Sequence, residues 1–101
     1  MNFEEEDRRM RQDVAETIGL KAVAWLAANE ELLPVFMGAS GTGTDDFRTR
    51  VAEPEFLASV LDFLMMDDAW VVEFCDAHTM PYDQLMLARQ SLPGGQQINW
   101  T

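Results

Sequence analysis

The chain contains a single cysteine, Cys75, among its 101 residues. One thiol cannot form a disulfide within the chain, which excludes a disulfide-stapled fold. Scarcity of cysteine is typical of proteins that fold in a reducing compartment. The first nine residues run from acidic to basic without an apolar core, so they do not resemble a secretory signal or a transit peptide. Together these absences predict a cytoplasmic location.

Positive charge is also scarce. Eighteen Asp and Glu residues outnumber seven Lys and Arg residues, which gives a formal net charge of -11. A surface of this sign repels nucleic-acid phosphates and anionic lipid headgroups, so we expect the protein to bind neither nucleic acid nor a membrane. It attracts basic proteins, and the expected partner is therefore another protein, with a basic one as a candidate. The same charge also fits an acidic protein that is simply soluble.

No segment alternates apolar and polar residues over a useful length, so we predict no sheet. No apolar run is long enough to span a bilayer. The chain does show helical periodicity, most strongly behind Pro54, where apolar residues fill well over half of a helical wheel and Ser59 and Asp62 share one narrow stripe. A helix that is apolar on most sides must be surrounded by other elements. Residues 54–66 are therefore predicted to form the central helix of an all-α protein.

The remaining periodicity predicts a compact bundle of five to six helices around this segment. The first helix is expected over about residues 13–28, with Val14 on its buried face. Asn29 is expected to cap the second helix, and Asp67 or Asp68 to cap the fifth.

The other boundaries rest on turn residues. Glycine-rich residues 38–43 are expected to form a loop, after which Thr44 caps a short helix of residues 45–52. Pro81 is expected to open the last helix, which runs to about Leu92.

A chain of this length has room for one domain. We expect residues 11–92 to form it, between a flexible charged segment of residues 1–10 and a flexible tail of residues 93–101. A shift of 38 residues aligns the apolar positions of the two halves, for example Phe36 with Phe74. Two similar three-helix units are one interpretation. The identity across the shift is at chance level, so coincidental alignment of two helical segments is the other.

Three side chains invite a chemical interpretation. Asp62 is the only charged residue in the apolar run from Phe56 to Met66. Cys75 and His78 lie three residues apart, on one face of a helix, where they can share a metal or line a pocket. Nothing on one helical turn orients the imidazole for nucleophilic catalysis. The structural interpretations are a buried thiol, an imidazole at a helix end and an Asp62 carboxylate paired with Arg48 or Arg50.

Exposed apolar residues give the stronger functional prediction. In the last helix Met86 and Leu87 fall off the expected buried face, and Tyr82 lies at its edge. Trp100 is a large apolar group in the tail. A patch formed by these four side chains would mark a contact with a partner or a second copy of the chain. The alternative is that the first helix or the tail covers it.

Three segments carry a family resemblance: residues 25–36 (WLAANEELLPVF), 46–48 (DFR) and 53–64 (EPEFLASVLDFL). They resemble a family of short bacterial proteins catalogued only as a domain of unknown function. The likeness covers about residues 13–93. It implies a small, stand-alone cytoplasmic bacterial protein and transfers no catalytic or binding residue.

The sequence therefore predicts a small acidic cytoplasmic protein–protein interaction module without catalysis. No catalytic residue, cofactor or metal is predicted. The alternative is a small enzyme or ligand-binding helical domain with a pocket near Asp62, Cys75 and His78. A third hypothesis, an acidic mimic of nucleic acid, requires the carboxylates to gather on one face.

Overall fold

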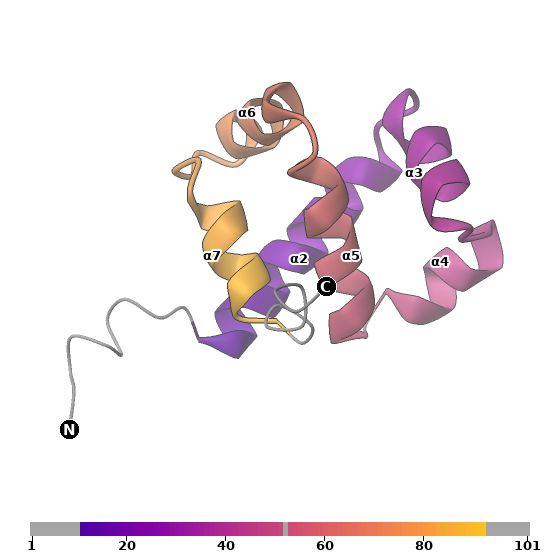
Figure 1. Cartoon of the computed structure of the whole chain (residues 1–101), viewed down its shortest axis with the longest axis horizontal. Coiled ribbons are helices and arrows are strands. Elements are labelled where there is room, and N and C mark those ends of the chain that lie inside the picture. Colours follow the sequence, from indigo (N-terminus) through magenta and orange to yellow (C-terminus); the bar gives the residue numbers. More distant parts are fainter. Residues whose placement is uncertain (1–10, 52, 93–101) are drawn as a thin grey trace.

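The computed structural model describes residues 11–51 and 53–92. Within this part the chain forms six helices and no strand, which confirms the predicted all-α bundle (Figure 1). The helices are α2 (Gln12–Ala27), α3 (Leu32–Ser40), α4 (Thr44–Arg50), α5 (Pro54–Leu64), α6 (Asp68–Ala77) and α7 (Gln84–Gln90). The segments expected at 1–10 and 93–101 lie outside the described residues. No helix in the described part is both long and apolar enough to cross a membrane.

Helix α5 is the central element, as its sequence predicts. Pro54 opens it, where the missing N–H has no intrahelical partner to lose. Ser59 and Asp62 lie half-buried on the remaining polar stripe. Seven of its eleven residues are buried: Phe56, Leu57, Ala58, Val60, Leu61, Phe63 and Leu64. Because these side chains point in several directions, α5 must be covered on several sides.

Helix α2 supplies one of those covers, and small residues let it approach closely. Gly19 is buried in α2, and a Cβ atom built there would lie 2.8 Å from the Cβ atom of Leu57. Ala15 and Ala22, one turn away on either side, are fully buried. The inward face therefore runs through Ala15, and the expectation that Val14 points inward is wrong, since Val14 is 44% exposed one position off that face.

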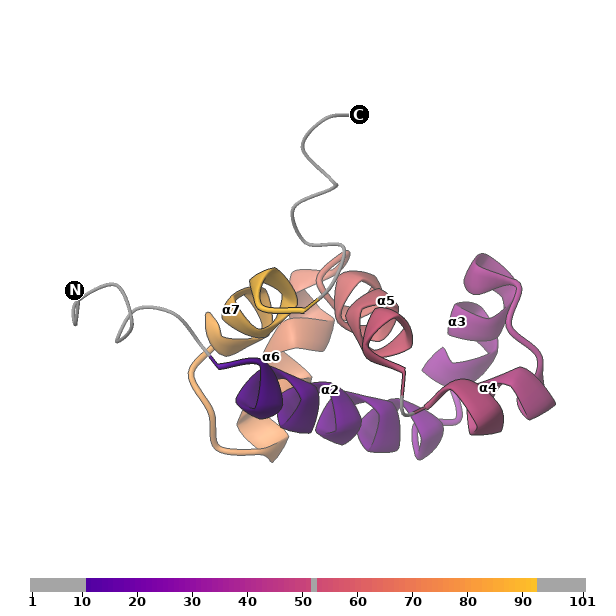
Figure 2. The ribbon, with the colours of Figure 1, turned by 90° about the horizontal axis from the view of Figure 1, so that it is seen from below.

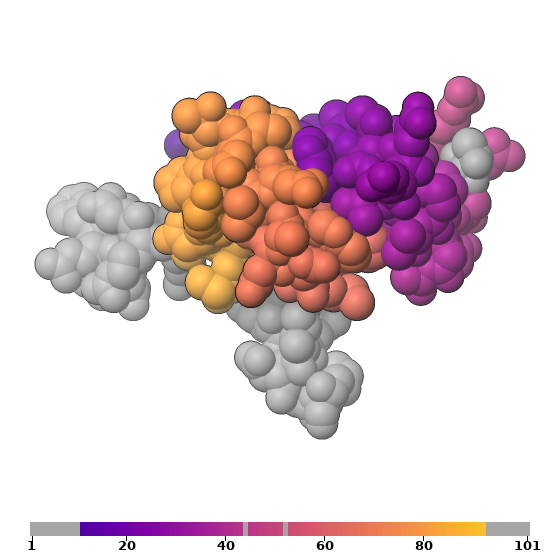
Figure 3. Space-filling model, turned by 90° about the horizontal axis from the view of Figure 1, so that it is seen from above, coloured from indigo at the N-terminus to yellow at the C-terminus, as the bar shows by residue number. Residues whose placement is uncertain are grey.

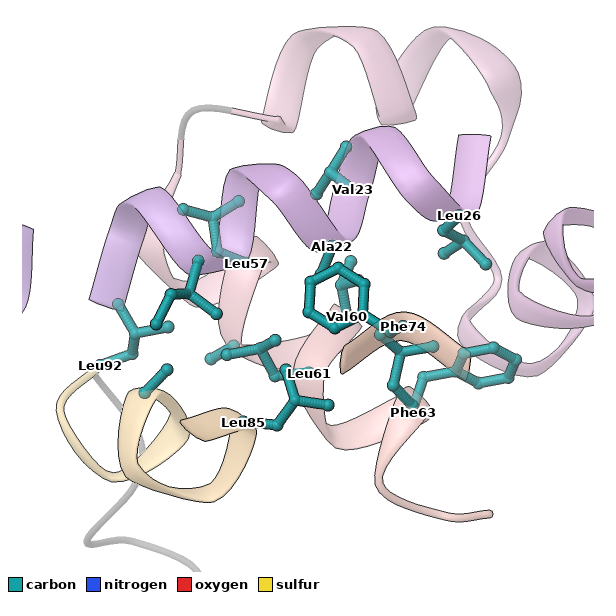
Figure 4. Packing of buried hydrophobic residues seen from close by; sticks show 14 of the residues in the cluster. Ala22, Val23, Leu26, Leu57, Val60, Leu61, Phe63, Phe74, Leu85 and Leu92 are labelled. Atoms are coloured by element: carbon teal, nitrogen blue, oxygen red, sulfur yellow. The ribbon is translucent and has the colours of Figure 1, made fainter. Parts of the chain in front are cut away.

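Helix α7 covers a second side of the core. It packs against both α2 and α5, and Figure 2 shows α5 and α7 side by side over α2. In Figure 4 Leu85 of α7 and Leu92, which follows it, point towards Leu57 and Leu61 of α5. The core therefore sits where these three helices meet.

Aromatic rings hold α3 and α4 against one end of the bundle. Phe36 of α3 makes edge-to-face contacts with Phe47, Phe56 and Phe63, with ring centroids 6.2, 6.0 and 5.2 Å away. Phe63 also stacks on Trp70 of α6 at 4.9 Å. Each such pair adds about 0.5–1.5 kcal/mol beyond the area it buries. The cluster joins helices that share few other contacts.

The start of α3 confirms one predicted cap, and its end corrects a predicted loop. The Oδ1 atom of Asn29 accepts hydrogen bonds from the N–H groups of residues 31 and 32, both at 3.1 Å. The helix then continues to Ser40, so the first three residues of the expected 38–43 loop are helical. The reason is that Gly41, with φ of 74°, takes the left-handed conformation that ends a helix, whereas Gly38 is tolerated inside it.

Helix α4 also begins differently from the expectation. Thr44 is its first residue and Gly43 occupies the capping position, so the predicted cap by Thr44 is wrong. Glycine is acceptable there because the position needs extended backbone, and Gly43 has φ of -85° and ψ of 174°. Asp45 and Asp46 lie in the first turn, where negative charge is favourable.

The last helix is shorter than predicted. It begins at Gln84 rather than at Pro81, and it ends at Gln90 rather than near Leu92. The N–H of Gln84 binds the carbonyl of Pro81 at 3.1 Å, which closes a turn instead of a helical ring. Proline at this place therefore serves a turn, a position that its fixed φ suits as well as a helix start.

The hypothesis of two three-helix units stays a prediction. The order of a long, a medium and a short helix does recur, with 16, 9 and 7 residues followed by 11, 10 and 7. The packing of the two short helices differs, however. Helix α7 lies against both long helices, α2 and α5. Helix α4 instead contacts α3 and α5 through the rings of Phe47, Phe36 and Phe56.

Candidate interaction surface at the α6–α7 corner

The chain reverses direction between α6 and α7 through a strained residue. The N–H of Met80 binds the carbonyl of Cys75 at 2.9 Å, and the N–H of Thr79 binds that of Asp76 at 3.3 Å. These two bonds form a Schellman motif, whose residue after the C-cap is usually glycine. Here it is Thr79, with φ of 53°, the only non-glycine residue with positive φ in the described part of the chain. A β-branched residue is unfavourable in this conformation.

This bend frames an open hollow of about 430 Å³ at the surface. The hollow lies between the C-terminal end of α6 and the turn that leads into α7. Its lining comprises Cys75, Asp76, Thr79, Met80, Pro81 and Tyr82. We call these lining residues, together with Met86 in the first turn of α7, the α6–α7 corner.

One hydrogen bond organises the polar side of the hollow. The hydroxyl of Tyr82 donates to Oδ1 of Asp76 at 2.9 Å and ties the turn back to α6. This bond, together with the negative charge of Asp76, raises the pKa of Tyr82 above its ordinary value, so the phenol stays protonated. An ionised carboxylate has about four lone-pair sites, so Asp76 can accept from a further donor.

The apolar residues of the corner are accessible. Tyr82 is 53% exposed and Met86 is 49% exposed, whereas Leu87 is half-buried. Trp100, the fourth residue expected at the contact, lies outside the described residues. In Figure 3 the orange α6–α7 segment occupies one face of the molecule, beside the purple α2–α3 segment. The structure thus leaves Tyr82, which lines the hollow, and Met86, in the first turn of α7, uncovered by the described residues.

Cys75 lies at the inner wall of the hollow and is fully buried. Burial and then the negative charges of Asp76 and Asp83 raise the pKa of its thiol. A cysteine nucleophile needs the opposite shift, because the thiolate is the reactive form. The surroundings of Cys75 thus favour an inert structural thiol.

His78 occupies the end of α6, as one sequence interpretation states. Its Nδ1 atom lies 3.0 Å from the carbonyl oxygen of Phe74, to which a protonated Nδ1 donates. Its ring lies against that of Phe74, with centroids 4.4 Å apart. His78 is half-buried and is not part of the lining of the hollow.

Asp62 has a different partner from the one expected. Its Oδ1 atom lies 2.7 Å from Nε of Arg89, so the bridge joins α5 to α7. The predicted pairing with Arg48 or Arg50 is wrong, because α4 lies at the other end of the bundle and Arg50 binds Glu53 at 3.3 Å.

The three candidates Asp62, Cys75 and His78 therefore do not share the hollow, since Cys75 alone lines it. Among the described residues no group of three or more His, Cys, Asp and Glu side chains is arranged to hold a metal ion. The enzyme or ligand-binding alternative stays a prediction to which this hollow adds no support.

Sequence reasoning missed Thr79 and Met80 as parts of a site, and it considered Asp76 only as a possible third metal ligand beside Cys75 and His78. The prediction that Pro81 opens a helix leaves no place for the turn in which this proline lies. One signal was available, because no Lys or Arg occurs between Arg50 and Arg89. That gap marks α6 and the turn after it as a surface without positive side chains.

Comparison with known proteins places the chain in a family. A family model described as "Protein of unknown function (DUF3572)" matches residues 12–95, and the chain belongs to this family. No curated protein and no solved structure matches it. The matched range contains all six helices and the α6–α7 corner.

Proposed function

Starting from membership in a family without an assigned role, we propose that the protein is a small, non-catalytic interaction module that binds another protein through the α6–α7 corner. The observation that supports this is the open hollow lined by the accessible Tyr82, with a second accessible apolar side chain, Met86, four residues further along the chain in α7. Accessible apolar groups beside a concavity are typical of protein contact sites.

The residue types at the corner suit such a contact. Tyrosine presents a rigid apolar ring with a polar tip, and methionine adapts its shape to a partner. Both are enriched at protein interfaces. Tyr82 is held at its hydroxyl by Asp76, so its ring loses little conformational freedom on binding.

Net charge and cysteine content support a protein partner and a cytoplasmic location. The net charge of -11 disfavours nucleic acid and anionic membranes as partners, and it favours another protein. The single cysteine, which cannot form a disulfide within the chain, suits the reducing cytoplasm of a bacterial cell.

The test compares two variants with matched exposure. Met86 of α7 and Val35 of α3 are both 49% exposed. The helices α7 and α3 that carry them lie on different sides of the molecule (Figure 1). The tagged full chain carrying Met86→Asp or Val35→Asp is used to capture proteins from its own cells, with circular dichroism to check that both variants are folded. We expect at least one partner to be retained by Val35→Asp and lost by Met86→Asp. Capture that is unchanged by Met86→Asp, or equally lost in both variants, contradicts the proposal.

A further inference from the structure

The α6–α7 corner carries negative charge without a neighbouring positive side chain from its own segment. Asp76 lines the hollow and Asp83 follows Tyr82 in the turn, and both are exposed. Arg89, the first Lys or Arg after Arg50, forms an ion pair with Asp62. The corner thus combines apolar walls with an acidic rim, which favours a partner that carries both a positive charge and apolar surface.

We propose that the corner binds a basic segment of a partner protein, in which a Lys or Arg side chain stands beside an apolar residue. This inference rests on the proposed function and adds the chemistry of the partner. The cation contacts the carboxylate of Asp76, and the aliphatic stem that carries it lies along Met80 and Pro81. The apolar neighbour of the cation packs on Tyr82 and Met86.

The geometry of Asp76 suits this role. The hydroxyl of Tyr82, at 2.9 Å from Oδ1, fixes the orientation of the carboxylate and leaves lone pairs for a charged donor. The tyrosine ring adjoins the same carboxylate, and a cation over an aromatic face is attracted to it. Asp83 adds a second negative charge, which is close enough to raise the pKa of the Cys75 thiol on the wall of the hollow.

The walls explain why a side chain fits better than a metal ion. Met80 and Pro81 contribute apolar surface, along which the methylene groups of Lys or Arg can lie while the charge reaches the rim. A divalent ion such as Ca²⁺ needs six or more oxygen ligands. Among the described residues no cluster of even three candidate ligands is present.

The first experiment measures binding of two synthetic peptides to the full chain by NMR. The probes are acetylated, amidated Ala-Leu-Arg-Leu-Ala and Ala-Leu-Gln-Leu-Ala, which differ only in the central charge. We expect the Arg peptide at millimolar concentration to shift the amide signals of Thr79, Met80 and Tyr82, and the Gln peptide to bind roughly tenfold more weakly. Salt of about 1 M, where the Debye length is about 3 Å, should remove most of the difference.

Two variants that each lose one negative charge distinguish a contact at Asp76 from a general effect of net charge. Asp76→Asn should weaken the Arg peptide roughly tenfold, whereas Asp45→Asn, in α4 at the other end of the bundle, should leave its affinity unchanged. Equal affinity for both peptides, shifts that map elsewhere, no binding of either peptide, or equal effects of the two variants overturn the inference.

The partner-capture assay separates this inference from the proposed function. If Met86→Asp abolishes capture and Asp76→Asn does not, the interaction surface stands and the basic segment is refuted. If Met86→Asp leaves capture unchanged, the proposed function itself fails. If Met86→Asp and Asp76→Asn both abolish capture and Asp45→Asn does not, both proposals are supported.

Discussion

Gly19 shows how a single residue sets the distance between two helices. Replacement by Ala gains about 1 kcal/mol of helix propensity. The added Cβ, however, would lie 2.8 Å from Cβ of Leu57, which is not the flexible end of a side chain. Overpacking of this kind costs about 1–3 kcal/mol and forces the helices apart. We therefore expect Gly19→Ala to lower the free energy of unfolding by up to about 2 kcal/mol, measured by urea denaturation.

Gly38→Ala is the matched control, because it makes the same change at an exposed position inside a helix. No atom lies within 4 Å of a Cβ built at Gly38. The propensity gain then acts alone, and we expect the variant to be more stable by about 0.5–1 kcal/mol. Changes of the same sign at both glycines would refute the idea that close helix approach fixes Gly19.

Thr79 gives a second test at this scale, because its backbone conformation suits glycine. A non-glycine residue with left-handed φ costs about 1–2 kcal/mol, and part of that is recovered when the Cβ is removed. Glycine loses more chain entropy on folding, so we expect Thr79→Gly to raise stability by a net amount of about 0.5–1 kcal/mol. Thr79→Ala keeps the Cβ and should gain less. If urea denaturation shows Thr79→Gly to be less stable than wild type, the backbone of Thr79 is not strained.

The residues that sequence reasoning placed correctly are those whose partners are close in the chain. Asn29 and Asp67 accept bonds from N–H groups two or three positions ahead, so a cap is visible in the local pattern. Asp62 could not be paired in this way, because Arg89 is 27 residues away and reaches it only through the packing of α7 on α5. The same holds for Gly19, whose importance depends on how α2 and α5 cross.

At the scale of elements, the interior of a helix was more predictable than its ends. The pattern of α5 indicates a buried helix because seven inward side chains occur within eleven residues. The start of α7 was misplaced because proline suits both a turn and the first position of a helix. In the structure a left-handed residue, Thr79, ends α6 just before this turn. Threonine disfavours that conformation, so the sequence does not indicate it.

The Asp62–Arg89 bridge joins two elements and can be measured as a coupling. The Arg89 side chain is 10% exposed and that of Asp62 is 44% exposed, so solvent screens the pair only in part. We expect Asp62→Ala and Arg89→Met each to lower the free energy of unfolding by about 1–2 kcal/mol. In the double variant the loss should be smaller than the sum by at least about 0.5 kcal/mol. Strict additivity would show that the bridge does not stabilise the contact of α5 with α7.

At the scale of the whole molecule, the sequence predicted part of the candidate site. Met86 and Leu87 are predicted at the contact because they fall off the apolar face of the last helix, and Tyr82 because it lies at the edge of that face. Tyr82 and Met86 are exposed in the structure, whereas Leu87 is half-buried. The hollow beside them was not predictable, because it forms where a Schellman turn brings Thr79 and Met80 back against the end of α6. A surface made by chain reversal has no periodic signature in the sequence.

The pH dependence of stability tests this corner in the intact molecule. The pKa values of Cys75 and Tyr82 are both raised in the folded protein, from ordinary values of 9.0 and 10.0. The unfolded chain therefore loses these protons first, so their contribution to stability is complete below about pH 9 and decreases as the pH rises through the folded values. We expect the thermal midpoint of wild type to be level from about pH 7 to 8 and to fall above about pH 9.

Deprotonation elsewhere also adds negative charge at high pH, so the measurement needs a variant that lacks both groups. Cys75→Ala with Tyr82→Phe removes the two titrations and keeps a small apolar residue and an aromatic ring in place. Its midpoint starts lower, because a buried sulfur is lost, but it should fall less than that of wild type between about pH 9 and 11. Parallel decreases in the two proteins would show that general charge repulsion, and not the environment of the α6–α7 corner, causes the alkaline loss of stability.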